Sequence, residues 1–239
     1  MATATETKNT ALTVWAKLPA GYEFPEQDLR PERYRIKARG FEGPVDTVTN
    51  MTGVILAVRE ARWMPFIELD GKGNEIERDP VPTQCQLVER GVGEWHTAPL
   101  DIDGPVERRE CASCPMNRWG TAANGGKGKA CREKRLLLVL RDGEALPVVV
   151  VAPPTSLLSV GQFETRAAAR RLRLGQIHVK LSTSYQKSGQ MEWGVLSIEE
   201  LEILDAAAQA ALVERLMDGP LHDFYTAWTQ PPVQQDQTF

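Results

Sequence analysis

All four cysteines of the 239-residue chain lie between positions 85 and 131, and their spacing resembles that of a metal site. Cys111 and Cys114 form a C-x2-C pair, which lets two thiolates bind one metal ion. Cys131 follows after sixteen intervening residues, a distance found in many sites of this kind. These three cysteines are therefore predicted to bind one metal ion together.

The fourth ligand is either Cys85 or His96. We favour Cys85, because the chain then holds no odd thiol and because the segment Pro82-x-x-Cys85 resembles the end of a strand. Four thiolates fill the tetrahedral coordination of Zn²⁺ and leave no open position for a substrate. The sequence thus predicts structural zinc and not a catalytic metal.

Other interpretations of the cysteines remain open at this point. Four unrelated buried thiols are one, and disulfides are another, although the start MATATETKNT has no secretion signal. An iron–sulfur cluster would also use four thiolates, usually at tighter local spacings. The gathering of every cysteine in one segment favours zinc.

The segment around the cysteines is rich in bases and glycines. Between Pro105 and Arg135 the chain carries eight Lys or Arg and three acids, although its net charge is -4. The stretch GGKGKAC does not match a Walker A loop, which requires G-x4-G-K-[ST] between a strand and a helix. Exposed amides and lysines in such a loop can instead approach a phosphate backbone closely.

Aromatic residues stand in basic surroundings at several other places. A second basic stretch, Arg166 to Lys180, holds five bases and no acid. Single-stranded nucleic acid is bound by a basic groove together with aromatic faces on which bases stack. The predicted stacking residues are Trp63, Trp119, Tyr185 and Trp193. The predicted phosphate contacts are Arg118, Lys127, Lys129, Arg132, Lys134, Arg170, Arg171, Arg173 and Lys180.

Catalytic motifs are poor by comparison. The three histidines, His96, His178 and His222, have no Ser or Cys nucleophile in a recognisable motif nearby, and no H-E-x-x-H or paired acidic motif is present. We therefore expect no enzymatic activity, no catalytic residue and no small-molecule substrate.

The elements that must position these residues are mainly strands. Patterns of β-branched and aromatic residues predict strands at 12–18, 34–39, 52–63, 135–141, 146–152, 176–185 and 191–198. The turn Lys187-Ser188-Gly189-Gln190 predicts a hairpin that brings Tyr185 and Trp193 near each other. Helices are predicted from Thr155 or Ser156 toward Leu174, at 205–217, and briefly after Gly219-Pro220.

This pattern predicts an α+β, mainly β fold: an oligonucleotide-binding (OB)-like β-barrel with a zinc-stabilised insertion at about 80–134 and C-terminal helices. Residues 11–228 would form one domain between a disordered tail at 1–10 and a flexible tail at 229–239. With 42% hydrophobic and 25% charged residues, and with no apolar run long enough to span a membrane, we expect a cytoplasmic protein without membrane partners.

The central segment resembles a group of tailed-phage proteins with the pattern C-x2-C-P-x-N-x-[WF]-G-[ST] followed by G-K-G-K-A-C. Here the pattern runs from Cys111 through Asn117, Trp119 and Thr121 to Cys131, and a later P-P-T-S segment matches residues 153–156. The resemblance covers about residues 80 to 200. Such proteins are regarded as phage single-stranded-DNA-binding proteins of the OB type, although the ending QQDQTF lacks the acidic tail that many of them use to recruit partners.

The resemblance implies sequence-tolerant binding of single-stranded DNA in phage-type replication or recombination, with replication or recombination proteins as partners, in the cytoplasm of the host cell. The alternative from another class is a zinc-organised protein-interaction or transcription-regulating module that binds duplex DNA or a polymerase.

Overall fold

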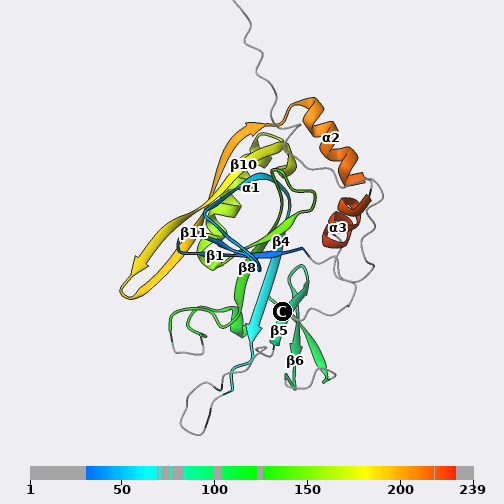
Figure 1. Ribbon diagram of the computed structural model, residues 1–239. Coiled ribbons are helices and arrows are strands. Elements are labelled where there is room, and N and C mark those ends of the chain that lie inside the picture. The colour runs from blue at the N-terminus through cyan, green and yellow to red at the C-terminus, as the bar shows by residue number, and fades with distance from the viewer. Residues whose placement is uncertain are drawn as a thin grey trace, which may run out of the picture. The chain divides into compact units, whose positions relative to one another are not determined.

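The computed structural model describes residues 31–68, 70, 76, 83–99, 104–122, 126–217 and 219–229. These form two compact units, one of residues 31–58 and 136–229 and the other of Arg59–Arg135 (Figure 1). The predicted tail at 1–10 and the predicted strand at 12–18 lie outside the described residues, as does the predicted tail at 229–239 apart from Thr229. All four cysteines belong to the second unit.

A mixed sheet forms the first unit, in the order β3-β2-β1-β9-β8-β4-β10-β11. Strand β1 pairs in parallel with β9, whereas β1 with β2, β4 with β10 and β10 with β11 are antiparallel. Strands β4 and β8 also contribute residues to the second unit. The bounds are β1 Arg33–Lys37, β2 Gly40–Glu42, β3 Thr47–Val48, β4 Asn50–Pro65, β8 Arg132–Arg141, β9 Val148–Ala152, β10 Ile177–Ser188 and β11 Met191–Ile203.

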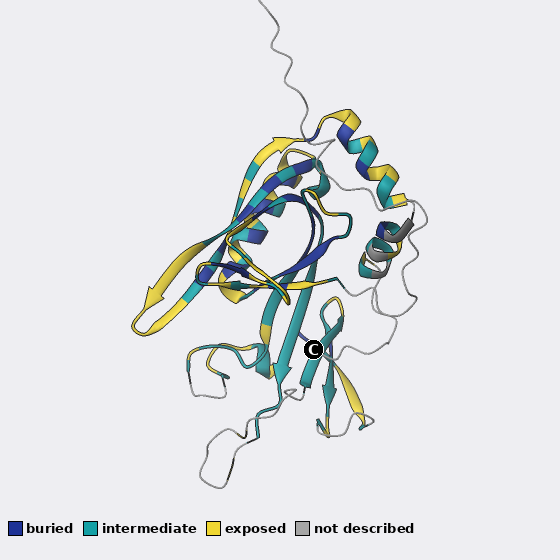
Figure 2. Cartoon of the chain, in the orientation of Figure 1, coloured by how far each residue is buried: buried dark blue, intermediate teal, exposed yellow. Residues whose placement is uncertain are grey.

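The hydrophobic core of this unit lies on both faces of the sheet. The run Leu137–Leu140 of β8 is fully buried, with Leu137 and Val139 in the main cluster and Leu140 in a second one. Side chains alternate between faces along a strand, so a continuous apolar run is what a strand covered on both sides requires. Figure 2 shows this burial in dark blue, in contrast to the exposed tip of the β10–β11 hairpin.

Helices cover the two faces. Helix α1 (Leu157–Ala169) packs Val160, Phe163 and Ala167 into the main cluster, and α2 (Ala206–Met217) packs Ala208 and Leu212 into the second. Helix α3 (Gly219–Thr229) follows directly. All three predicted helices are present, but α1 ends at Ala169 and does not reach the predicted end near Leu174. The predicted cap Ser156 does not cap the helix with its hydroxyl, because its Oγ accepts a hydrogen bond from the amide of Leu196, 2.9 Å away.

Strand β11, at one end of this sheet, approaches β1, which lies near the other end. A Cβ added at Gly194 of β11 would lie 2.0 Å from the carbonyl oxygen of Lys37 in β1, so only glycine allows this contact. The hydrogen-bonded ladder nevertheless stays open, because the described pairing of β11 is with β10. The prediction of a mainly β fold with C-terminal helices is confirmed, in the form of a large curved sheet that is not closed.

The second unit is an antiparallel meander that the sequence did not predict. Strand β5 (Thr83–Glu89) pairs with the end of β4 and with β6 (Val92–His96), which pairs with β7 (Val106–Glu110). A short 3-10 helix, Pro115–Asn117, follows the C-x2-C pair. Charged residues occupy much of these strands, as VERRE in β7 shows, so they lack the apolar alternation by which strands are recognised.

None of the helices that the structure describes is long and apolar enough to cross a membrane.

Candidate metal centre and basic loop

The four cysteines, far apart in sequence, line one small cavity in the second unit. Met64, Cys85 and Trp95 are directly paired positions of β4, β5 and β6, so their side chains share one face of the meander. Cys111 follows β7, and its amide donates to the carbonyl oxygen of Gly91, 2.8 Å away. Cys114 and Cys131 complete the sulfur lining.

His96 lies elsewhere. It follows Trp95 in β6, and successive residues of a strand point to opposite faces, so it does not line the cysteine cavity. Its Nε2 is buried and has no hydrogen-bond partner among the described residues. The geometry thus groups Cys85, and not His96, with the other three cysteines.

The cavity suits a single ion. Its volume is about 10 Å³, close to the space that one water molecule needs. Gly93 makes this room, because a Cβ there would lie 2.9 Å from Sγ of Cys85 and 3.7 Å from Sγ of Cys111. As the side chains stand, no group of three or more His, Cys, Asp or Glu in the described segments is arranged to hold a metal ion. The chemistry of the four thiols, and not their present arrangement, is what suits a metal ion.

The second unit has almost no hydrophobic core of its own. Among its described residues only Gly93 and Cys111 are buried, whereas the first unit buries two clusters of large apolar side chains. Small structures without a sufficient core are commonly held by a metal or by disulfides. The four thiols lie where a hydrophobic core would be expected.

Burial raises the pKa of three of these thiols. The pKa of Cys85 is raised to about 12 and that of Cys131 to about 11, first by burial and then by the neighbouring sulfurs, and the pKa of Cys111 is raised as well. Thiols packed together in an apolar cavity resist ionisation because each thiolate would face the others. Binding of a divalent cation would lower the pKa of these thiols, since the cation stabilises thiolates directly.

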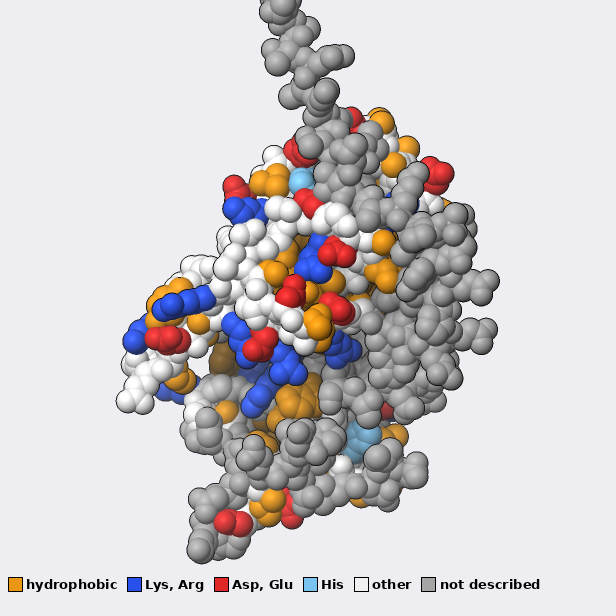
Figure 3. Space-filling view, in the orientation of Figure 1, with side chains coloured by type: hydrophobic (Ala, Val, Ile, Leu, Met, Phe, Trp, Pro, Cys, Tyr) orange, Lys and Arg blue, Asp and Glu red, His pale blue; other side chains and the backbone are white. Residues whose placement is uncertain are grey.

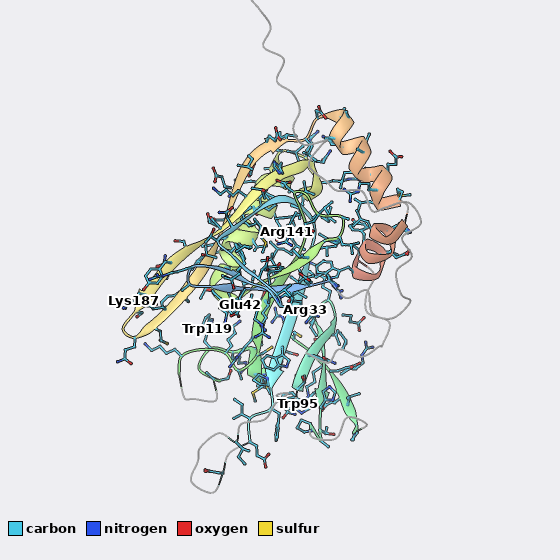
Figure 4. The ribbon with its side chains drawn as sticks, in the orientation of Figure 1. Arg33, Glu42, Trp95, Trp119, Arg141 and Lys187 are labelled. Atoms are coloured by element: carbon cyan, nitrogen blue, oxygen red, sulfur yellow. The ribbon has the colours of Figure 1, made fainter. Side chains whose placement is uncertain are left out.

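Two arginines supply positive charge beside the sulfurs, and the sequence did not reveal their roles. The charge of Arg62 in β4 opposes the rise in the pKa of Cys111 and Cys131, and that of Arg109 in β7 opposes the rise in the pKa of Cys85. Arg62 is held by Glu60 at 2.6 Å and by Glu133 at 3.4 Å, and its buried Nη1 has no hydrogen-bond partner among the described residues. The Arg109 guanidinium lies 4.2 Å from the ring centre of Trp95 (Figure 4).

The loop between Cys114 and Cys131 is tied down by its own polar residues. The carbonyl oxygen of Gly128 accepts hydrogen bonds from the amides of residues 120, 121 and 122, at 2.9 to 3.1 Å. The Thr121 hydroxyl lies 3.1 Å and 2.8 Å from the carbonyl oxygens of Met116 and Arg118, and it accepts from the amide of Ala130 at 3.0 Å. Several residues of the sequence motif therefore have a structural role in shaping the loop.

Side chains that do not shape the loop are exposed. Trp119 is 78% exposed, and Nζ of Lys129 lies 5.6 Å from its ring centre (Figure 4). Arg118, Lys127 and Arg132 are also exposed. A tryptophan this open to solvent is unusual in a folded chain, because burying its large ring is favourable.

Trp63 differs from Trp119 in that two cations of the protein itself lie over its ring. Its Nε1 donates to Oγ1 of Thr83 at 3.1 Å, while Arg132 and Lys134 lie over the ring at 5.8 Å and 5.3 Å. The structure brings these three predicted nucleic-acid contacts together within the second unit.

The remaining predicted nucleic-acid contacts lie in the first unit, and several already contact other side chains of the protein. Arg170 and Arg166 both pair with Glu200 of β11. Arg171, next in the chain, adopts a positive φ of 57° just after α1 and is exposed, as is Arg173. Lys180 is half-buried on β10.

The hairpin aromatics point in opposite directions. Tyr185 pairs with Gly194 and Gln186 with Trp193, so Tyr185 and Trp193 lie on opposite faces of the ribbon instead of side by side. Arg39 lies 5.8 Å from the Tyr185 ring, and Lys187 pairs with Glu192 at 3.3 Å. Charged side chains of both signs and apolar ones mix on the hairpin in Figure 3.

In comparisons with known proteins, no family model, no curated protein and no solved structure matches this chain.

Proposed function

We propose that this protein binds single-stranded DNA without strong sequence preference, through a basic aromatic loop that a structural zinc ion holds in shape. No chemical step is part of this function. Cys85, Cys111, Cys114 and Cys131 would be the zinc ligands, and their two arginine neighbours would offset the negative charge of a four-thiolate site. Replication and recombination are the processes that require such binding.

The observation that carries the proposal is that some cations of the second unit form ion pairs with carboxylates and others do not. Arg62, Arg108, Arg109 and Arg135 each contact a carboxylate within 3.4 Å. Among the described residues, Arg118, Lys127, Lys129 and Arg132 have no carboxylate partner. Arg118 precedes the exposed Trp119 in the chain, and Lys129 lies 5.6 Å from the centre of its ring. Unneutralised cations beside an open aromatic ring are the combination that single strands require.

The first unit supports the proposal through its architecture. Its curved sheet, in which Gly194 of β11 lies against Lys37 of β1, is consistent with a distorted OB-like barrel that carries the second unit as an insertion. Tyr185 and Arg39 on the hairpin side of this sheet would add a further stacking position.

Titration of the zinc-loaded protein with fluorescent oligo-dT and with duplex, over a range of salt concentrations, tests the proposal. The expected result is tighter binding of oligo-dT, with a log–log salt slope of about -0.7 per phosphate neutralised. The single variants Arg118→Ala and Lys127→Ala should each weaken binding and reduce this slope. Arg108→Ala is the matched control, since Arg108 is exposed but already paired with Glu89 at 2.8 Å.

Equal or tighter binding of the duplex would reject the proposal and favour the duplex-binding module. A fall in affinity for Arg108→Ala as large as for the loop variants would show that net charge alone, and not the free cations of the loop, drives binding.

A further inference from the structure

A second cavity of about 330 Å³ opens beside the cysteine cavity, within the same unit. Its apolar walls include Met64, Phe66 and Met116, and its cations are Lys129 and Arg132. This volume is at the lower end of the range for pockets that enclose small organic ligands. It can therefore admit one planar group with its substituents, but not a longer segment of polymer.

The charges of the cavity favour an anionic ligand. No acidic residue is among those that line it, and neither Lys129 nor Arg132 pairs with a carboxylate in the described part of the chain. Lys129 donates to Oδ1 of Asn117 at 3.1 Å, which leaves further N–H groups of its ammonium for a phosphate. Arg132, 5.8 Å from the Trp63 ring centre, connects the cavity with that aromatic face.

The polar groups of the cavity are largely engaged with the backbone. Nε2 of Gln84 donates to the carbonyl oxygen of His96 at 2.5 Å, and the Thr121 hydroxyl is shared among three backbone groups. Few donors and acceptors are thus left to distinguish one base edge from another. A ligand held here would be recognised by its flat apolar face and its negative charge.

Met64 and Met116 line this cavity and the cysteine cavity alike. The backbone of Met116 also accepts from the amide of Cys131 at 3.1 Å. The wall of the larger cavity is therefore built on the cysteine cluster, and an ion bound by the cysteines would fix that wall.

From these features we propose that the cavity binds one unstacked nucleotide of a single DNA strand, with the base against Phe66 and the methionines and an adjacent phosphate at Lys129 and Arg132. This inference rests on the proposed function. It adds that one nucleotide is drawn out of the strand at a fixed position, while its neighbours remain on the surface.

Filling the cavity provides the test. In zinc-loaded Ala122→Trp, the new indole would occupy the base position without changing any charge. Oligo-dT affinity should fall about 5- to 100-fold, the loss of one stacked base, while the salt slope stays unchanged. Ala168→Trp, on the exposed side of α1, is the matched control and should bind as the wild type does. Phe66→Ala, which removes the apolar wall, serves if the Trp variant does not fold.

A scan of single abasic sites through the shortest oligo-dT that still binds, on which the protein has one register, locates the nucleotide. In the wild type one position should weaken binding by a comparable factor, and that effect should disappear in Ala122→Trp. If the wild type binds oligo-dT but the scan is flat, or if the filled variant binds equally well, this inference is overturned while the proposed function stands. Failure of the wild type to bind oligo-dT overturns both, and tighter binding of free dTMP than of the oligonucleotide would assign the cavity to a free nucleotide.

Discussion

Oδ1 of Asn117 accepts a hydrogen bond from Nζ of Lys129 at 3.1 Å, while Nδ2 of the same side chain donates to the carbonyl oxygen of Cys111 at 2.9 Å. One amide thus joins the C-x2-C pair to the basic end of the loop, twelve residues away. The cysteine cluster and the proposed DNA-binding surface are therefore mechanically connected.

Replacing Asn117 with Ala should weaken both features. Loss of its two hydrogen bonds is expected to cost about 1–3 kcal/mol of folding free energy, to speed zinc loss to a chelator, and to lower oligo-dT affinity because Lys129 loses its anchor. Chelator competition and oligo-dT titration measure the two effects. Asn50→Ala, at an exposed position of the first unit, should change neither. A normal zinc release rate in Asn117→Ala would contradict the connection.

Loss of a ligand should unfold the second unit. Cys114→Ser, or removal of zinc by a chelator, forfeits binding free energy that is also folding free energy, and this unit buries little else. Metal analysis should find one zinc per wild-type chain and a lowered content in the variant, together with a lower melting temperature or aggregation. Ser113→Ala, at the exposed neighbouring position, is the control. A soluble Cys114→Ser protein with an unchanged melting temperature would refute a structural metal site.

Arg62 should support the metal centre from outside. In Arg62→Gln, the carboxylates of Glu60 and Glu133 lose a partly buried partner, which should cost about 1.5–3 kcal/mol. Zinc affinity should fall about 10- to 100-fold, as is usual when a residue supporting metal ligands is lost. Competition against a zinc indicator measures it. Arg135→Gln removes another partner of Glu133 but should leave zinc affinity near that of the wild type. Equal effects of the two variants would show that only Glu133 matters.

The first unit contains a pH-dependent ion pair. Nε2 of His178 lies 3.0 Å from both carboxylate oxygens of Asp142. The hydrogen bond to Asp142 raises the pKa of His178 despite partial burial. Burial opposes ionisation of Asp142, but hydrogen bonds with His178 and Thr52 outweigh it and lower its pKa.

A raised histidine pKa stabilises the fold fully below the unfolded value of about 6.5, and this contribution disappears as the pH rises through the folded value. The lowered Asp142 pKa contributes above about pH 4 and is lost in acid. His178→Gln should therefore lower the melting temperature most near pH 5 to 6, roughly between these limits, and less above the folded pKa of His178. Melting curves across this range, with His222→Gln as the control, measure the difference. A constant difference at every pH would mean that the charge of His178 plays no part.

Local patterns in the sequence were sufficient for most of the first unit. The apolar run of β8, the hairpin turn at Gly189 and Gln190, and the helices near 157–169 and 206–217 were predicted because each depends on neighbouring residues. The meander of β5, β6 and β7 was missed, because its strands are polar and are organised around cysteines instead of an apolar face.

By itself, the sequence determined that Cys111, Cys114 and Cys131 belong together and that bases crowd around them, since spacing and composition are local properties. Only the tertiary structure showed that Cys85, and not His96, lies beside these three cysteines, because its position depends on the register of β5 against β6, which no short segment encodes. The tertiary structure also determined which cations form ion pairs, and it placed Tyr185 and Trp193 on opposite faces of the hairpin. Ion-pair partners and strand faces are set by residues distant in the chain, and so they emerge only when the chain is folded.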